Sequence, residues 1–334
     1  NMTMITRIDQ DAASSRADLA AEKKLFAHYG LDYKIHFLEM AEPNLRLRVL
    51  EVGAGRPLLM VPGGTGDAAF FAPLMAKLTG WRMIAINRPG GGLSDAVDHR
   101  RVDLRQLAVN TLRSVADAFE LPRVPIVCNS MGGLWSFYYT LAHPERVSCM
   151  VQMGCPALAL DTSAPFFMRL LSVPVVKNFI VAAMQPKSAA AALEGLRFQG
   201  SSQADIANMP GVLAEVAYRF FNLSTYRETW KTLVTAVASL RGSNPRYSLT
   251  ADALRQIACP VQFVWGENDP FGSLDVAREM VRLMSNASLH EMSCGHLPFL
   301  DKPEETGQVV QAFLTNHSSG EQQIMRRTVP RYGN

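Results

Sequence analysis

A serine at position 130 lies where a strand-like run gives way to a helical one. Four apolar residues within 124–128 indicate the end of a buried strand, and a helical run follows over 134–142. A serine between the two must occupy a sharp turn, where its backbone is strained and its hydroxyl projects clear of the sheet. The N–H of Met131 would lie unpaired at the helix start, which favours developing negative charge. Such a hydroxyl could attack a carbonyl carbon; the plainer alternative is a serine that only caps the helix.

This turn resembles the nucleophile elbow of the α/β-hydrolases, and it reads Cys128-Asn129-Ser130-Met131-Gly132. In that elbow the residues two before and two after the serine face each other, so both must be small. Gly132 meets this requirement, and Cys128, where the family usually has glycine, is small enough to fit. The resemblance covers roughly residues 33–156 and 251–316. It implies an α/β-hydrolase fold, a mostly parallel central sheet flanked by helices, and a triad ordered serine, acid, histidine along the chain.

Two later loops supply an acid and a histidine in the settings that the resemblance implies. Asp269 follows a strand-like run at 261–265 and stands where the family's triad acid stands. His296 follows a glycine in a tight loop after the strand-like run 289–292. Together with Ser130, both would lie at the carboxyl ends of parallel strands, where open α/β sheets place their sites.

The acid and the histidine each have alternatives. Asp269 precedes a proline and also suits a plain turn, and Glu267 or Asp161 could serve as the acid instead. His296 could be an ordinary loop histidine. The other histidines have no comparable setting: His28, His36, His99, His143, His290 and His317. The prediction therefore depends on three residue types occurring in the right order, each at a strand end.

A glycine-rich loop could supply the backbone donors of an oxyanion hole. It reads Val61-Pro62-Gly63-Gly64-Thr65-Gly66, where the family usually has His-Gly-Gly-x-Gly. The resemblance matches Gly64 to the residue whose N–H points at the oxyanion, and the Met131 N–H would be the second donor. We also predict three substrate contacts, each at a residue adjacent in sequence to a predicted site residue: Gly63, Asn129 and Leu297. The run 88–95 resembles the family's loop after the next strand, and we assign it a structural role.

Strand-like and helical runs alternate along most of the chain. Strands are predicted at 33–38, 45–52, 58–61, 83–86, 124–128, 147–153, 261–265 and 288–292, and helices at 11–29, 69–78, 104–119, 134–142, 275–284 and 304–314. This alternation indicates an α/β fold in which helices cover both faces of a parallel sheet.

The alternation stops between residues 157 and 250, where helical stretches occur without a clear strand. We predict a helical cap at 157–250, inserted into a core made of 31–156 and 251–316. The cap's phenylalanines and methionines suit an apolar acyl or ring-bearing substrate, although most of them should form the cap's own core. The segment 1–30 should carry one helix, and residues 1 to about 7 resemble a cloning-vector leader. Residues 317–334 are polar and basic and indicate a mobile tail.

The composition argues against several classes of protein. Of the 334 residues, 48% are hydrophobic, and the net charge of +3 gives no electrostatic footprint for nucleic acid. Five cysteines without paired spacing favour a reducing, cytoplasmic compartment. We expect no signal peptide, no membrane span, no cofactor and no metal site. The expected partner is a small apolar ester or related acyl molecule, and the oligomeric state stays open.

The resemblance implies a serine hydrolase that cleaves carboxylic esters of small to medium apolar substrates through an acyl-enzyme. The run 129–133 is also similar to C–C bond hydrolases that act on ring-cleavage products, although those usually have an aromatic residue where this chain has Leu297. The alternatives are such an enzyme, a lactonase, or a weakly catalytic ligand-binding relative. A thiol enzyme using Cys128 or Cys294 is disfavoured, because Cys128 should point into the elbow and away from the site.

Overall fold

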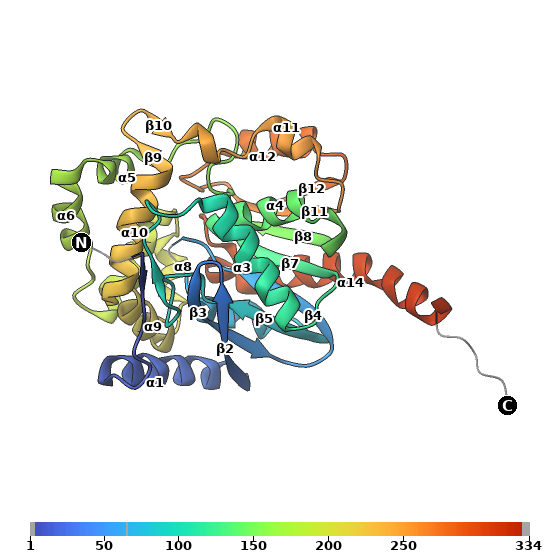
Figure 1. Cartoon of the computed structure of the whole chain (residues 1–334), viewed down its shortest axis with the longest axis horizontal. Coiled ribbons are helices and arrows are strands. Elements are labelled where there is room, and N and C mark those ends of the chain that lie inside the picture. Colours follow the sequence, from blue (N-terminus) through green and yellow to red (C-terminus); the bar gives the residue numbers. More distant parts are fainter. Residues whose placement is uncertain (1–3, 65, 329–334) are drawn as a thin grey trace.

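An eight-stranded mixed sheet forms the centre of the protein. The computed structural model describes residues 4–64 and 66–328, and within them the strands pair in the order β12-β11-β8-β7-β4-β5-β3-β2 (Figure 1). Neighbours are parallel from β12 through to β5, while β3 is antiparallel to both β5 and β2. Their bounds are β2 (Tyr33–Ala41), β3 (Asn44–Val52), β4 (Arg56–Val61), β5 (Trp81–Ile86), β7 (Val124–Asn129), β8 (Val147–Met153), β11 (Val261–Gly266) and β12 (Ala287–Met292).

Both faces of this sheet are covered, which explains why its central strands are almost entirely apolar. Alternate residues of β4 enter different cores, with Leu58 and Met60 on one face and Leu59 and Val61 on the other. Every residue of β7 and β8 is buried. The mostly parallel, two-sided sheet predicted from the sequence is confirmed, and each predicted strand lies within the observed ones or a residue of their ends.

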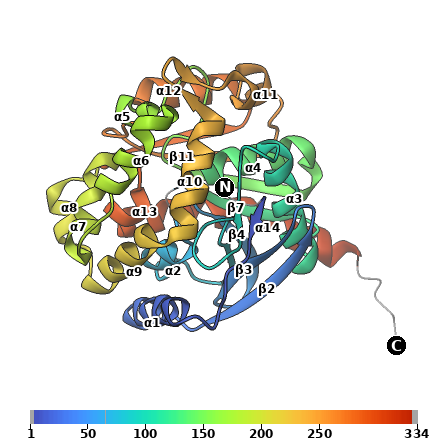
Figure 2. The same cartoon turned by 60° about the vertical axis from the view of Figure 1, so that its left-hand side comes forward.

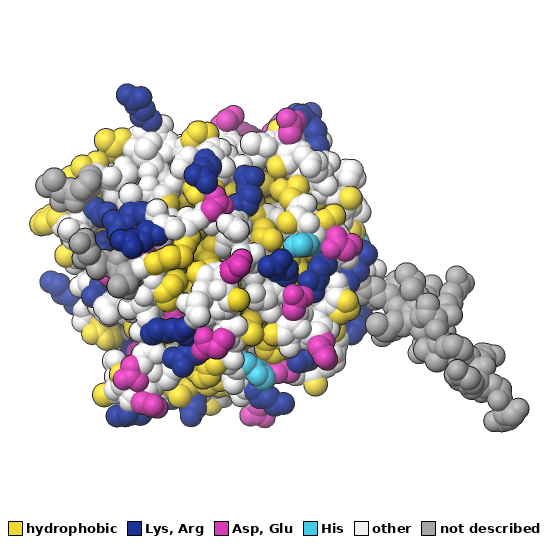
Figure 3. Space-filling model, viewed as in Figure 1, with side chains coloured by type: hydrophobic (Ala, Val, Ile, Leu, Met, Phe, Trp, Pro, Cys, Tyr) yellow, Lys and Arg dark blue, Asp and Glu magenta, His cyan; other side chains and the backbone are white. Residues whose placement is uncertain are grey.

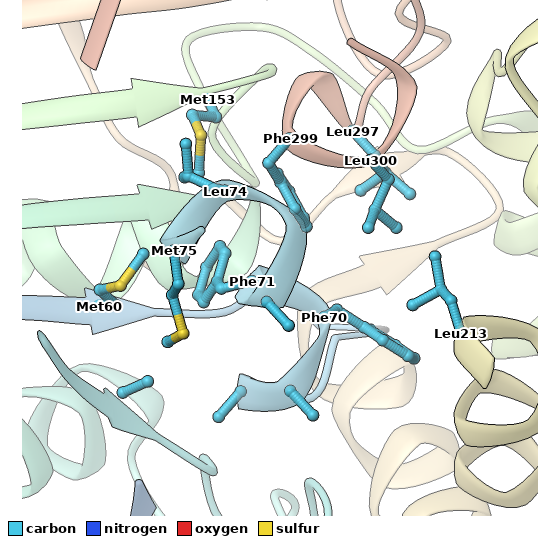
Figure 4. Close-up of a cluster of buried hydrophobic side chains, with 14 of the residues drawn as sticks. Met60, Phe70, Phe71, Leu74, Met75, Met153, Leu213, Leu297, Phe299 and Leu300 are labelled. Carbon is cyan, nitrogen blue, oxygen red and sulfur yellow. The ribbon is translucent and has the colours of Figure 1, made fainter. Parts of the chain in front are cut away.

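Helices pack on each face of the sheet. One core receives side chains from α3 (Leu104–Ala118), α4 (Met131–Ala142), α11 (Ala251–Arg255) and α12 (Leu274–Leu283). The opposite core receives them from α1 (Ala13–His28), η1 (Ala68–Phe71), α2 (Ala72–Met75), α13 (Pro298–Asp301) and α14 (Pro303–Thr328). Figure 4 shows this second core, where the Phe71 ring lies 5.0 Å from the Phe299 ring and Met75 lies near Met60 of β4.

Most of the chain between β8 and α11 is helical and lies toward the left in Figures 1 and 2. We call residues 157–250 the cap. Its helices are α5 (Phe166–Arg169), η3 (Leu170–Ser172), α6 (Pro174–Ala183), α7 (Ala189–Glu194), η4 (Gly195–Gln199), α8 (Gln203–Ala207), α9 (Gly211–Asn222), α10 (Ser224–Val237) and η5 (Pro245–Tyr247). The sequence indicates no strand here, but the structure has a two-residue antiparallel pair, β9 (Ala238–Ser239) with β10 (Gly242–Ser243).

Two segments differ from the sequence-based prediction. The predicted helix at 69–78 is shorter: a 3-10 turn begins after Asp67, whose carboxylate accepts the Ala69 N–H at 2.8 Å, and α2 ends at Met75. The predicted tail from 317 is helical as far as the described residues reach, because α14 continues to Thr328, and its mobility stays a prediction. Good helix formers over 321–327 account for that continuation. Residues 329–334 of the predicted tail lie outside the described part of the chain.

The N-terminus also pairs with the body of the protein. The predicted vector leader spans residues 1 to about 7, of which 1–3 lie outside the described residues. β1 (Ile5–Thr6) pairs antiparallel with β6 (Ala96–Val97), and the Ile8 N–H donates to Asp95 at 2.8 Å. This end of the chain is therefore held against the loop that follows β5.

Acidic and basic side chains are interspersed over the face of the molecule that Figure 3 shows, as the small net charge leads one to expect. Within residues 4–64 and 66–328, no helix has the combination of length and apolar character that crossing a membrane requires.

Candidate active site

Ser130 occupies a strained turn between β7 and α4. Its φ of 51° and ψ of −116° fall outside the regions that residues with a side chain favour, as the elbow geometry requires. Ser130 is the residue before the first turn of α4, but its side chain makes no capping hydrogen bond there. This argues against the alternative that the serine serves only as a helix cap.

The elbow fits because its neighbours are small. A Cβ atom added to Gly132 would lie 2.2 Å from the Val61 carbonyl oxygen and 2.4 Å from that of Pro62. The backbone after β4 therefore passes directly against the elbow. The Cys128 thiol is buried and donates to the Gln152 side-chain oxygen at 3.1 Å, and burial raises the pKa of Cys128 to about 12. Burial likewise raises the pKa of Cys294, so neither thiol is a ready nucleophile near neutral pH.

His296 and Asp269 form a buried pair. The His296 Nδ1 atom lies 2.7 Å from Asp269 Oδ2, and both side chains are almost inaccessible to solvent. Asp269 is itself fixed by backbone donors, since Oδ2 accepts the Cys155 N–H at 2.8 Å and Oδ1 accepts the Phe271 N–H at 2.9 Å. An ionised carboxylate can only accept hydrogen bonds, so this contact places the imidazole proton on Nδ1 and leaves Nε2 as a proton acceptor.

The alternative acids do not take this place. The Glu267 carboxylate accepts a hydrogen bond from the Ser293 hydroxyl at 2.7 Å on the exposed side of the same loop. Asp161 is exposed on the cap. Among the three candidate acids, Asp269 is the one whose carboxylate contacts His296.

The residue next to Ser130 links the elbow to the histidine loop. The Asn129 side-chain amide donates to the His296 carbonyl oxygen at 3.1 Å and to that of Met153 at 2.8 Å. The Phe271 ring lies 4.3 Å from the His296 ring and also lines the pocket that contains Ser130. His296 Nε2 is buried, and the described residues give it no hydrogen-bond partner. Ser130 and His296 thus belong to the same edge of the sheet, but their side chains are not hydrogen-bonded to each other in this structure.

The glycine-rich loop packs against the elbow. A Cβ atom on Gly63 would lie 2.6 Å from Asn129 Oδ1 and 3.2 Å from Ser130 Cβ, so a side chain is excluded there. Gly64 lies beside Met131, and both line the Ser130 pocket. Thr65, also in the predicted loop, lies outside the described residues.

Arg88 fixes that loop from behind. Its guanidinium donates to the carbonyl oxygens of Pro62 at 3.0 Å and Gly63 at 2.5 Å. Burial lowers the pKa of Arg88 to about 10. The resemblance predicts a structural role for the loop 88–95, and no local pattern in the sequence indicates that its arginine reaches the predicted oxyanion loop.

The pocket at Ser130 lies between the elbow and the cap and opens to solvent. Its walls come from Ser130, Gly64 and Met131 on one side and from Trp230 and Leu233 of the cap on the other. Two of the predicted substrate contacts, Asn129 and Leu297, line a small neighbouring apolar pocket, together with Phe299 and Leu300 of the core that Figure 4 shows. Gly63, the third, packs against Asn129 and Ser130 and is not among the residues that line either pocket.

The cap approaches the histidine loop very closely. The His296 N–H donates to the Gln199 carbonyl oxygen of η4 at 2.8 Å. Next to this bond, a Cβ atom on Gly295 would lie 2.4 Å from the Gly200 carbonyl carbon. Sequence reasoning missed Gln199, Phe271 and Trp230 as site residues. Only Phe271 had a signal, its position two residues after the predicted acid.

The chain belongs to the α/β-hydrolase fold family, whose sequence profile matches residues 56–303. Its relatives include a 2-hydroxy-6-oxononadienedioate/2-hydroxy-6-oxononatrienedioate hydrolase from Cupriavidus pinatubonensis, which is 27% identical over 286 residues, or 82% of this chain and 92% of the relative. The hydrolase of the same name from Burkholderia vietnamiensis is 28% identical over 290 residues, or 85% and 92% of the two chains.

Solved structures with similar folds include both esterases and C–C hydrolases. Carboxylesterase CesB (YbfK) from Bacillus subtilis superposes with a TM-score of 0.70 at 18% identity, covering 91% of this chain and 99% of the other. A meta-cleavage product hydrolase (CumD) superposes with a TM-score of 0.64 at 18% identity, covering 84% and 98%. These structures support the fold, and at such identities they carry no argument about the substrate.

Proposed function

We propose that the protein is a serine hydrolase that cleaves carboxylic esters of small to medium apolar substrates. The observation that carries this proposal is the buried hydrogen bond between His296 and Asp269, beside a strained serine whose pocket is also lined by Gly64 and Met131. Nucleophile, base and orienting acid are the parts that acyl transfer needs.

In this mechanism Ser130 Oγ attacks the ester carbonyl carbon while His296 Nε2 takes the hydroxyl proton. The tetrahedral oxyanion accepts hydrogen bonds from the N–H groups of Met131 and Gly64, each of which is worth about 10²–10³-fold in rate. The intermediate collapses, and the departing alcohol oxygen takes the proton from His296. Water then attacks the acyl-enzyme with His296 as base, which releases the acid and restores Ser130. Asp269 keeps the imidazole in the required tautomer throughout.

The experiment is hydrolysis of p-nitrophenyl acetate and butyrate by the parent and two variants. We expect Ser130→Ala to lower kcat/KM by about 10⁴-fold or more. Ser163→Ala removes another hydroxyl from the lining of the same pocket and should keep the rate within about twofold. Equal activity in the parent and Ser130→Ala would discard the assignment.

Cleavage of a C–C bond beside a ketone is the second candidate, because the relatives described above are named for it. The same serine, histidine and oxyanion donors could serve that reaction. Parallel assays with a 2-hydroxy-6-oxo-dienoate and with p-nitrophenyl butyrate decide between the two. A higher kcat/KM for the dienoate, with both activities lost in Ser130→Ala, would replace the ester assignment and keep the triad.

A further inference from the structure

A second cavity lies within the cap. The space opens to solvent on one side, and aromatic and aliphatic side chains dominate its wall, among them Phe167, Val181, Met184, Phe198 and Phe221. Small residues of α7 and η4, Ala191, Ala192 and Gly195, leave the space open on one side. Arg227 is the one charged residue in this wall. Such a lining favours an apolar ligand.

The cap cavity and the Ser130 pocket share part of their walls. Met168, Gln199, Trp230 and Phe271 line both of them. Phe271 also lies against the His296 ring, so the shared wall begins at the predicted catalytic base. The two spaces are therefore adjacent, and an acyl chain that starts at a carbonyl carbon beside Ser130 would have to pass Trp230 and Phe271 to reach the cap cavity.

Resting on the proposed function, we propose that the cap cavity binds the aliphatic acyl chain of the substrate while the Ser130 pocket holds its ester group. The acyl part stays bonded to Ser130 until water arrives, so an apolar compartment for its chain serves both half-reactions. Each CH₂ group transferred from water to such a wall favours binding by roughly fourfold. Medium-chain acyl esters, rather than acetates, are then the preferred substrate class.

Gly195 is the position at which this idea is most cleanly tested. Gly195 is exposed, and its backbone is helical, with φ −59° and ψ −21°, so a residue with a side chain needs no strained φ there. A Cβ atom on Gly195 would meet nothing within 4 Å. A phenylalanine at this position should project into the cap cavity without straining the backbone. Ala191, on an exposed part of α7, offers a second position on the same wall.

The test measures kcat/KM for p-nitrophenyl acetate and octanoate in the parent, Gly195→Phe and Ala191→Trp. For both variants we expect the octanoate value to fall by about tenfold or more, while the acetate value stays within about twofold. Gly211→Phe is the matched control, since Gly211 is also a cap glycine with nothing within 4 Å of an added Cβ and lines neither pocket. It should leave both substrates unchanged.

Two results would overturn the proposal: equal octanoate rates in parent and cavity-filling variants, or an equal loss for acetate and octanoate. Melting temperatures within about 2 °C of the parent establish that the variants fold, and if one fails, the other carries the test. Ser130→Ala separates this proposal from the function itself. If Ser130→Ala loses acetate hydrolysis but Gly195→Phe leaves the ratio of octanoate to acetate kcat/KM unchanged, the serine mechanism stands and only the cap assignment fails.

Discussion

The sheet and the cap fix their side chains in different ways. At the site, parallel pairing sets Asn129 opposite Met153 and Gly266 opposite Met292, so the loops carrying Ser130 and Asp269 begin at one edge. Backbone bonds then tie the loops together, as when the Asn268 N–H donates to the Cys294 carbonyl oxygen at 3.0 Å. The cap depends instead on side-chain packing, and much of its apolar surface stays exposed: Phe166, Phe179, Met184, Phe198 and Leu240.

This difference assigns separate tasks to the two regions. Backbone pairing sets the positions of the loops that carry Ser130 and Asp269, and side-chain substitutions elsewhere should barely change those positions. Packing in the cap gives the pocket a shape that single substitutions can change. We therefore expect variants at the site to abolish turnover and variants in the cap to change substrate preference or stability.

The largest effect should come from the buried acid. Asp269→Asn replaces a carboxylate oxygen with an amide group. The amide N–H then either faces the His296 and Cys155 donors, from which Asp269 Oδ2 now accepts hydrogen bonds, or stabilises the wrong tautomer of the imidazole. We expect kcat to fall by about 10⁴-fold. Glu267→Gln, two residues away, should change kcat less than about threefold, as measured with p-nitrophenyl butyrate. Similar losses of kcat in the two variants would mean that disturbance of the loop, rather than loss of the Asp269 carboxylate, lowers kcat.

A buried aromatic in the cap should come next. The Phe220 ring lies 5.5 Å from Phe70 of the core and 4.3 Å from Tyr226, and the residue is 4% exposed. Phe220→Ala should lower the free energy of unfolding by about 3–5 kcal/mol. Phe179→Ala, at a residue that is 77% exposed, should change it by less than about 0.5 kcal/mol. Urea unfolding measures both, and a negligible loss in Phe220→Ala would show that the cap is held by other contacts.

A methyl group at the elbow sharpens the same comparison. Gly132→Ala forces a Cβ atom against the carbonyl oxygens of Val61 and Pro62, and it should destabilise the protein by about 1–3 kcal/mol and reduce activity. Gly211→Ala, at the open start of α9, should instead be neutral or stabilising by up to about 1 kcal/mol. Thermal melts and ester hydrolysis test the pair, and equal behaviour would contradict the close contact at the elbow.

The smallest effect concerns the junction of the two regions, where Asp67 and Arg48 of the sheet domain meet Arg219 and Phe220 of α9. Burial raises the pKa of Asp67 to about 7, and the Glu22 charge adds to this, while the Ala69 N–H and the Arg48 charge partly oppose it. The folded protein therefore holds this proton more tightly than the unfolded chain, in which the pKa is about 3.9. The resulting stability is complete below about pH 4 and is lost as the pH rises through 7.

Asp67→Asn should consequently flatten the change in stability between pH 5 and pH 8. The measurement is the urea midpoint of parent and variant at both values. An unchanged difference between the two pH values would assign the pH dependence to other groups.

The sequence predicts the features set by local backbone patterns better than those set by packing between distant segments. The period of the strands and the small residues at the elbow are local, so the sheet, the turn at Ser130 and the order of Asp269 and His296 were accessible from the chain. The contact of Asp269 with His296 then agrees with the predicted acid. The loop at Gly64 was recognisable from its run of glycines, of which Gly63 leaves no room for a side chain beside Asn129 and Ser130.

The rest depended on contacts between segments far apart in the chain. That Arg88 reaches the Gly63 carbonyl, or that Gln199 accepts from His296, has no local pattern. The cap's lining could not be separated from its core by residue type, because Phe and Met serve both. The extent of α14 was underestimated for a different reason, since the polar and basic residues from 317 onward indicate a tail although several of them also favour a helix.

One bond connects the two regions more directly than packing does. Gln199 borders both compartments, and its carbonyl oxygen accepts the main-chain N–H of the imidazole-bearing residue. A ligand in the cap cavity that displaces Gln199 would either lengthen this hydrogen bond or move His296 together with Gln199. Binding in the cap cavity would then change the position of the imidazole.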